Sequence, residues 1–210
     1  RHVGGDYYDF FSLGQGRLGL FIGDISGKGI AAALLMANLQ ANLRSQFALA
    51  REQPHEFLRS VNRLFYDNTA DSSYATVFFA EYNDATQCLR YANCGHLSGL
   101  LLRHDQTVEW LRSTATVLGL FKEWDSPIVE CNLTRDDTLV LYTDGVTEAL
   151  NAAEEEFGEA GLVEAVKRHH TQDAQTMITS LVDELQRFSS GEQHDDMTLI
   201  VAKCRASLTN

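Results

Sequence analysis

Apolar residues recur with two different periods along the chain, and these periods predict where strands and helices lie. Strand-like runs occupy residues 7–13 and 17–25, with Gly14-Gln15-Gly16 as the turn between them. Residues 31–50 are rich in Ala, Leu, Met and Gln and contain no Gly or Pro, which predicts a long helix. Pro54 suits the first turn of a second helix. The apolar stripe of that second helix comprises Phe57, Leu58, Val61, Leu64 and Phe65.

The middle of the chain is rich in β-branched and aromatic residues and predicts a succession of short strands. Turn-forming residues separate them, as at Asn83-Asp84 and at His104-Asp105-Gln106. Strands joined by such short turns pair antiparallel, because parallel strands need long crossovers. The expected strands are residues 74–82, 88–92, 99–103, 108–111, 117–121, 128–133 and 138–143.

Helical spacing returns in the last third of the chain, at residues 160–170 and 173–188, and residues 197–203 predict a final strand. Strands and helices therefore come in separate runs, which is typical of the α+β class. Nine or ten strands should divide into two packed, mainly antiparallel sheets with helices outside. We expect one domain, spanning residues 1–205.

The composition indicates a globular protein and disfavours some classes of partner. Of the 210 residues, 44% are hydrophobic and 22% are charged, which is ordinary for a globular protein. The net charge of -12 disfavours nucleic acid as a partner. No apolar run is long enough to cross a bilayer and no secretory signal is present, so we expect a cytoplasmic protein. The four cysteines form no Cys-x-x-Cys pair, which indicates reduced thiols rather than a zinc site.

Acidic residues stand beside apolar segments, next to Gly or another acid, in four places: Asp6, Asp24, Asp144 and Asp195. Any one of them alone could simply cap a turn. Together they form a set of hard oxygen ligands, which suits Mg²⁺ or Mn²⁺ better than zinc. Neighbouring glycines would also let a main-chain carbonyl come close enough to ligate.

The glycine-rich segment 23–29 does not match a nucleotide-binding P-loop. Such a loop needs four residues between its first glycine and a Gly-Lys pair that Ser or Thr follows. Here three residues separate Gly23 from Gly27, and Gly29 stands in place of the hydroxyl residue. An NTP-driven kinase is therefore disfavoured.

Six motifs occur in a specific order, and together they resemble the type 2C, metal-dependent protein phosphatase (PPM) family. The resemblance covers residues 3–203 and is strongest to the bacterial branch typified by sporulation stage II protein E and the environmental regulators of sigma factors. The motifs are Val3-Gly-Gly-Asp-Tyr-Tyr-Asp-Phe10, Gly23-Asp-Ile-Ser-Gly-Lys-Gly29, Thr76-Val-Phe-Phe79, Tyr91-Ala-Asn-Cys-Gly-His96, Leu139-Val-Leu-Tyr-Thr-Asp-Gly-Val-Thr-Glu148 and Asp195-Asp-Met-Thr-Leu199.

This resemblance implies an αββα sandwich with a centre of two divalent cations, Mn²⁺ or Mg²⁺. Carried over by position, Asp24 should bridge both metals. Asp6 and the carbonyl of Ile25 should complete one metal, and Asp144 and Asp195 should hold the other. The cations would activate a water molecule against the phosphorus without a covalent intermediate. Asp24 and Asp144 are accordingly the expected catalytic residues.

Other residues near these motifs have less certain roles. Asp196 could ligate in place of its neighbour, although the family pattern favours the first of the two acids, and Asp9 is a candidate for a supporting role. Ser26 stands where eukaryotic members carry the His that suits leaving-group protonation, which leaves the general acid open. Lys28 is the nearest cation and a candidate for binding substrate, but a solvated loop lysine fits equally well. For His96 a structural role is favoured.

The resemblance also implies partners. The expected substrate is a phosphorylated regulatory protein of the anti-sigma-factor antagonist type, in bacterial signal transduction. Because the chain begins at Arg1 without Met, we expect a fragment that an upstream sensor or receiver domain precedes, as in two-component response regulators; a homodimer is left open. The alternative is a catalytically silent module that docks a sigma-factor regulator. Retention of all four Asp residues favours the enzyme.

Overall fold

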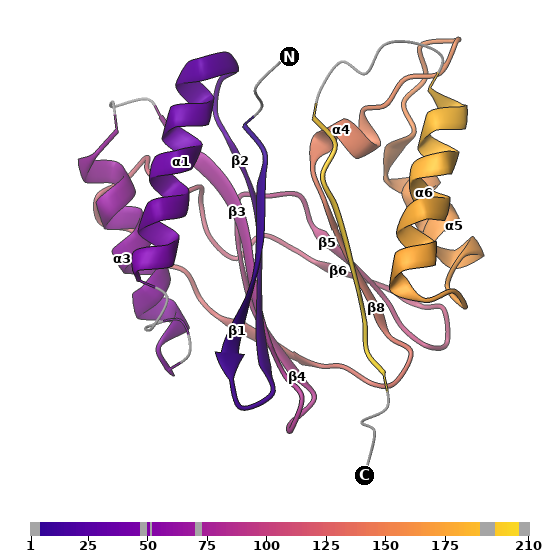
Figure 1. Ribbon diagram of the computed structural model, residues 1–210, viewed down its shortest axis with the longest axis horizontal. Helices are drawn as coiled ribbons and strands as arrows, with labels where there is room; N and C mark the ends of the chain where they lie inside the picture. The colour runs from indigo at the N-terminus through magenta and orange to yellow at the C-terminus, as the bar shows by residue number, and fades with distance from the viewer. Residues whose placement is uncertain (1–4, 47–49, 51, 70–72, 190–195, 206–210) are drawn as a thin grey trace. The chain divides into compact units, whose positions relative to one another are not determined.

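The chain forms two compact units, each built on one antiparallel sheet and its own helices (Figure 1). The computed structural model describes residues 5–46, 50, 52–69, 73–189 and 196–205. The first unit consists of Arg1–His96 and Arg112–Asn132, and the second of Leu97–Leu111 and Leu133–Asn210. The predicted α+β class with two antiparallel sheets is confirmed.

A five-stranded sheet forms the base of the first unit, with strand order β1-β2-β3-β4-β7 and antiparallel pairing throughout. The predicted turn after the first strand is confirmed. Gly14, Gln15 and Gly16 all have positive φ (75°, 52° and 70°), which costs the two glycines little. The strands are β1 (Tyr7–Gly14), β2 (Arg17–Ile25), β3 (Ala75–Asn83), β4 (Cys88–Cys94) and β7 (Val129–Asn132).

Helices α1 (Gly29–Ser45) and α3 (Pro54–Asp67) cover one face of this sheet. Buried side chains of both helices pack against strand residues such as Phe21 and Phe79. Strand residues with odd numbers in β1, β2 and β3 face these helices, and the even-numbered ones point to the other face. Two of those even-numbered residues, Leu20 and Ile22, are also buried.

Helix α1 is shorter than the prediction of residues 31–50. It ends at Ser45, and Gln46 has left helical geometry with φ -96° and ψ 4°. The Ser45 hydroxyl donates to the carbonyl of Asn42 at 2.9 Å. Such side-chain bonds compete with the main-chain ladder and favour a helix end. The Ala-rich composition predicted the helix correctly, but it could not show these polar contacts.

The predicted strand at residues 117–121 is wrong, and a buried amide explains why. Asn62 of α3 is 1% exposed. Its Oδ1 accepts from the N–H of Gly119 (2.9 Å), and its Nδ2 donates to the carbonyl of Phe121 (3.0 Å). These bonds hold the segment against the helix, so only Leu118 forms a bridge, with Ala75. The predicted apolar stripe of α3 is otherwise confirmed, with Leu64 only partly buried.

The second unit has a four-stranded antiparallel sheet with strand order β6-β5-β8-β9. Helices α5 and α6 pack on one face, where Leu162 and Leu181 meet Leu100 and Val140 of the sheet. A short helix, α4, follows β8 and was not predicted. No helix among the described residues is both long and apolar enough to cross a bilayer. The elements are β5 (Gly99–Leu102), β6 (Val108–Leu111), β8 (Thr138–Tyr142), α4 (Asp144–Thr147), α5 (Gly158–Arg168), α6 (Ala174–Phe188) and β9 (Leu199–Lys203).

Asp173 caps the N-terminus of α6, and its replacement by Ala should destabilise the chain in a pH-dependent way. Its carboxylate accepts from the N–H of Thr176 at 3.0 Å and from the hydroxyl of Thr176 at 2.8 Å. These bonds lower the pKa of Asp173 below 3.8. A lowered pKa means that the stabilisation exists above the unfolded-state pKa and disappears as the pH falls through the folded-state pKa. Asp173→Ala should therefore lower the Tm at neutral pH, and this difference from the wild type should shrink as the pH falls from neutral through the lowered pKa of Asp173.

Thermal unfolding followed by circular dichroism across this pH range measures the effect. Asp183→Ala is the matched control, because Asp183 is an exposed acid within the same helix. Equal shifts of Tm in the two variants at neutral pH would contradict the capping role.

Candidate metal site

Three of the five predicted metal ligands lie together at one end of the sheet of the first unit. Asp24 and Ile25 are the last two residues of β2, and Asp6 directly precedes β1. The N–H of Ile25 donates to the carbonyl of Gly5 at 3.4 Å, so the pairing of the two strands continues past β1. The register, extended by one residue beyond the pair of Tyr7 and Gly23, places Asp6 directly opposite Asp24.

Gly5 provides the space in which the oxygen atoms of this site converge. A Cβ atom at Gly5 would lie 2.6 Å from Oδ1 of Asp24 and 3.1 Å from the carbonyl oxygen of Ile25. Any other residue would therefore displace one of these oxygens. Two carboxylates and a main-chain carbonyl are the hard donors that Mg²⁺ and Mn²⁺ prefer. The residues present fit a divalent cation of this kind.

Polar residues of the neighbouring strand β3, and of the segment after β4, lie beside Asp24. Thr76 of β3 lies directly opposite Asp24, on the face turned away from α1 and α3. The hydroxyl of Thr76 is 2.9 Å from Nδ1 of His96, and the N–H of His96 donates to Oδ1 of Asn93 at 2.9 Å. His96 is 8% exposed. These contacts support the structural role predicted for His96, and they hold its ring beside Thr76.

Asp9 does not lie with Asp6 and Asp24, contrary to the expectation of a supporting role. It is an odd-numbered residue of β1 and faces α1, where its carboxylate accepts from the hydroxyl of Tyr7 at 2.5 Å and pairs with Arg44 at 2.8 Å. Burial, and then the bond to Asp9, raise the pKa of Tyr7. The sequence motif could not distinguish the two acids, because strand alternation, rather than proximity in sequence, separates their faces.

The residues after Ile25 connect the end of β2 to β3 and α1. The N–H of Ser26 donates to the carbonyl of Tyr74 at 2.9 Å, and the hydroxyl of Ser26 accepts from the N–H of Tyr74 at 3.0 Å. Ser26 thus fixes the end of the β2–β3 pair. Lys28 is exposed and directly precedes α1. Its role in binding substrate stays a prediction.

In the second unit, Asp144 follows the end of β8 and begins α4. The preceding residue, Thr143, is 1% exposed. Its N–H donates to the carbonyl of Thr198 at 3.1 Å, and its hydroxyl accepts from the N–H of Thr198 at 3.0 Å. This pair of bonds fixes the residue directly before Asp144 beside the segment that leads into β9.

A glycine also lies beside this second acidic position. A Cβ atom at Gly145 would lie 2.1 Å from the carbonyl oxygen of Asp196, so only glycine fits there. Asp144 and Asp196 therefore lie at the same end of the β8–β9 pair. Asp195 lies outside the described residues. Within the part of the chain that is described, no three His, Cys, Asp or Glu side chains form a cluster that could hold a metal ion.

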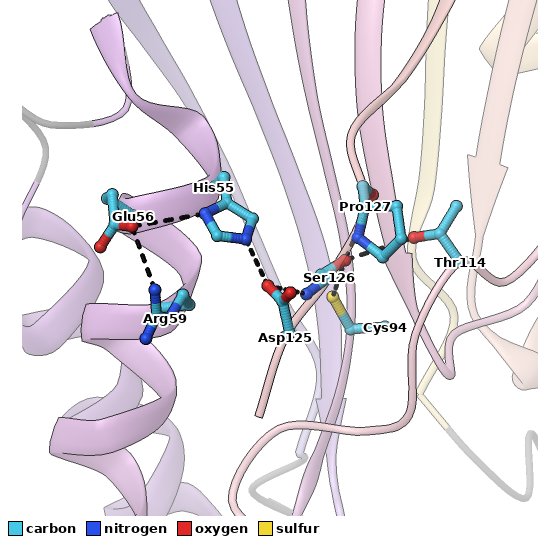
Figure 2. A network of polar contacts seen from close by, with 8 residues as sticks. All are labelled: His55, Glu56, Arg59, Cys94, Thr114, Asp125, Ser126 and Pro127. Carbon is cyan, nitrogen blue, oxygen red and sulfur yellow. Dashed lines mark hydrogen bonds and ion pairs between the residues drawn. The ribbon is translucent and has the colours of Figure 1, made fainter. Parts of the chain in front are cut away.

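A groove of about 1000 Å³ in the first unit contains none of the predicted site residues. It lies between α3 and residues 122–125 and is lined by charged side chains of both signs. Figure 2 shows the polar contacts beside it: His55 bonds Asp125, whose Oδ1 accepts from the N–H of Ser126 at 2.9 Å. The Ser126 hydroxyl contacts Thr114 (3.3 Å) and Cys94 (3.9 Å).

The cysteines carry no sign of chemistry. All four are free thiols, as predicted. Burial raises the pKa of Cys94 to about 12, so this thiol stays protonated at neutral pH. A protonated thiol is a poor nucleophile.

The chain is similar in sequence to one protein family and in fold to known structures. The model of the stage II sporulation protein E (SpoIIE) family matches residues 14–205. The chain is 32% identical over 205 residues to the phosphoserine phosphatase RsbU of Bacillus subtilis strain 168, an alignment that covers 97% of this chain and 60% of RsbU. The chain thus spans less than two thirds of that relative.

The solved structures that are similar to the chain include the following two. The RsbU and RsbW domains of Rv1364c from Mycobacterium tuberculosis superpose with a TM-score of 0.80 at 28% identity, covering 97% of this chain and 56% of that one. The PP2C phosphatase domain of SpoIIE from Bacillus subtilis, with a fragment of its regulatory domain, superposes with a TM-score of 0.83 at 22% identity, covering 98% and 60%. The latter similarity concerns the fold alone.

Proposed function

Because the chain belongs to the stage II sporulation protein E family, we propose that it is a metal-dependent protein serine/threonine phosphatase. It would hydrolyse a phosphoserine or phosphothreonine on a regulatory protein. The relative RsbU carries the name phosphoserine phosphatase, which supports this substrate class. A partner of the anti-sigma-factor antagonist type, and an upstream sensor or receiver domain, are part of the same proposal.

The single observation that carries the proposal is the convergence of oxygen donors at Gly5. Oδ1 of Asp24 and the carbonyl of Ile25 approach the position where any other residue would have its Cβ. Asp6 lies opposite Asp24 in the register. Two like charges directly opposite each other in a sheet are unfavourable. A divalent cation bound there would be attracted by both carboxylates.

In this proposal Asp6, Asp24 and the Ile25 carbonyl would hold one divalent cation. Asp144 and Asp195 would be the ligands that the second unit contributes. When bound, such cations supply positive charge that polarises the phosphoryl group and acidifies water. The chain's own contribution is to fix the carboxylates: strand pairing orients Asp24, Ser26 bonds to Tyr74 at the end of the β2–β3 pair, and the bonds of Thr143 to Thr198 hold the residue directly before Asp144.

Hydrolysis of an aryl phosphate with and without Mn²⁺ tests the proposal. We expect phosphate release that needs Mn²⁺, stops with a chelator, and is absent in Asp144→Asn. A catalytically silent module would show no Mn²⁺-dependent release in the wild type. That result would reject the phosphatase and leave the docking alternative.

A further inference from the structure

Strand β3 changes its neighbour close to the candidate metal site. Its antiparallel register with β4 ends at the pair of Phe78 and Asn93. Nearer the site, Ala75 pairs with Leu118 instead, and the N–H of each residue donates to the carbonyl of the other at 2.9 Å. Both residues are 0% exposed. The segment around Leu118 therefore takes the place of β4 beside the first residue of β3.

This first part of β3 also contacts the end of β2, where predicted metal ligands lie. Ala75 is opposite Ile25, which directly follows Asp24. Tyr74 exchanges two hydrogen bonds with Ser26, at 2.9 Å and 3.0 Å. The start of β3 is thus held between the end of β2 on one side and the segment around residue 118 on the other. A displacement of that segment would pass through β3 to the ligands.

One buried side chain holds the segment around Leu118 in place. Asn62 of α3 is 1% exposed. Its amide accepts from the N–H of Gly119 at 2.9 Å and donates to the carbonyl of Phe121 at 3.0 Å. The segment packs closely against the same helix, since a Cβ atom at Gly119 would lie 2.7 Å from Cδ1 of Phe65. Loss of the amide would leave two main-chain groups without this partner and loosen the segment.

We propose that Asn62 is a positioning residue for the metal site. It fixes residues 118–121, which fix Ala75 and, through it, the end of β2. The carboxylate of Asp24 and the carbonyl of Ile25 are thereby held where a cation can bind both. All of these contacts lie within the first unit. The inference rests on the proposed function and adds a residue outside the ligand set that controls the affinity for the cation, because contacts that orient ligands strengthen metal binding.

Calorimetric titration of Asn62→Ala with Mn²⁺ tests the inference on the 210-residue chain. Ala removes both hydrogen bonds and suits a helix. We expect the dissociation constant of the folded variant for Mn²⁺ to rise at least about tenfold, as it does when other contacts that orient metal ligands are removed. A residue that only stabilises the fold would leave the affinity of the folded state unchanged.

Glu81→Gln is the matched control for Asn62→Ala. Glu81 is also 1% exposed, but it lies at the other end of the β2–β3 pair from Asp24. This variant should lose stability and keep the dissociation constant of the wild type for Mn²⁺. Equally weakened binding in both variants would show a general effect of destabilisation and overturn the inference. Wild-type affinity in Asn62→Ala would overturn it as well.

Hydrogen exchange of the wild-type chain is a second arm, which does not depend on the folding of any variant. Coupling between two sites is reciprocal, so a segment that strengthens Mn²⁺ binding must itself be stabilised by Mn²⁺. The amides of Leu118 and Gly119 should exchange at least about tenfold more slowly with saturating Mn²⁺ than with a chelator. The amide of Asp84, which donates to Gly16 at 3.0 Å at the other end of the β2–β3 pair, should not change. Equal exchange rates at Leu118 and Gly119 in the two conditions, or equal slowing at Asp84, would contradict the proposed coupling.

Failure of this inference can be told apart from failure of the proposed function. A wild-type chain that neither binds Mn²⁺ nor hydrolyses an aryl phosphate would reject the proposed function and the role of Asn62 with it. A wild-type chain that does both, with a variant Asn62→Ala that binds Mn²⁺ equally well, would reject the role of Asn62 alone.

Discussion

Asp24→Asn should reduce Mn²⁺-dependent hydrolysis of an aryl phosphate by at least about a thousandfold, equivalent to about 4 kcal/mol of activation free energy. The substitution keeps the size of the side chain and removes its charge. Oδ1 of Asp24 is the atom nearest to the position that a Cβ of residue 5 would occupy, and in the proposal this carboxylate is a metal ligand. Initial rates of phosphate release at saturating Mn²⁺ measure the loss, and calorimetric titration with Mn²⁺ measures the accompanying loss of binding.

Asp9→Asn is the matched control for Asp24→Asn. Asp9 belongs to the same strand pair but faces α1, where it pairs with the exposed Arg44. We expect Asp9→Asn to retain Mn²⁺ binding and phosphate release. If both variants lost activity to the same extent, the assignment of the metal site to the Asp6–Asp24 end would be contradicted.

The sequence predicted the parts of the fold that depend on local pattern. Antiparallel strands followed from short turns, and Gly14 and Gly16 indicated the first of these turns correctly. Helix α3 followed from Pro54 and from its apolar period. The strand predicted at residues 117–121 failed because the outcome depends on Asn62, which lies 57 residues away from Gly119. No local pattern contains a contact of that range.

The motifs predicted which residues form the candidate site, but they did not predict which of these residues share a face of the sheet. The motifs named Asp6, Asp24 and Ile25, and the structure brings these three together. Asp9 points to the other face of the sheet because side chains alternate along a strand, and a motif does not show this alternation.

Glu81→Gln should lower the free energy of unfolding by about 3 kcal/mol, because it removes one charge from a mostly buried ion cluster. The side chain of Glu81 is 1% exposed, and its two carboxylate oxygens pair with Arg17 and Arg90, which are 18% and 25% exposed. The Nε of Arg90 donates to Oε2 of Glu81 at 3.0 Å. After substitution, two guanidinium groups would keep their cost of desolvation without an anion between them. Urea unfolding followed by circular dichroism measures the change.

Glu130→Gln separates this effect from a general loss of negative charge. Glu130 lies opposite Arg90 on β7, on the other side of β4 from Glu81, but it is exposed. Exposed pairs contribute little, so we expect the free energy of unfolding to change by less than about 0.5 kcal/mol. Since Glu81 is at the opposite end of its strand pair from Asp24, Glu81→Gln should lower stability without altering Mn²⁺ affinity in the folded chain. Equal stability losses in Glu81→Gln and Glu130→Gln would show that the cluster around Glu81 has no special role in holding β2, β3 and β4 together.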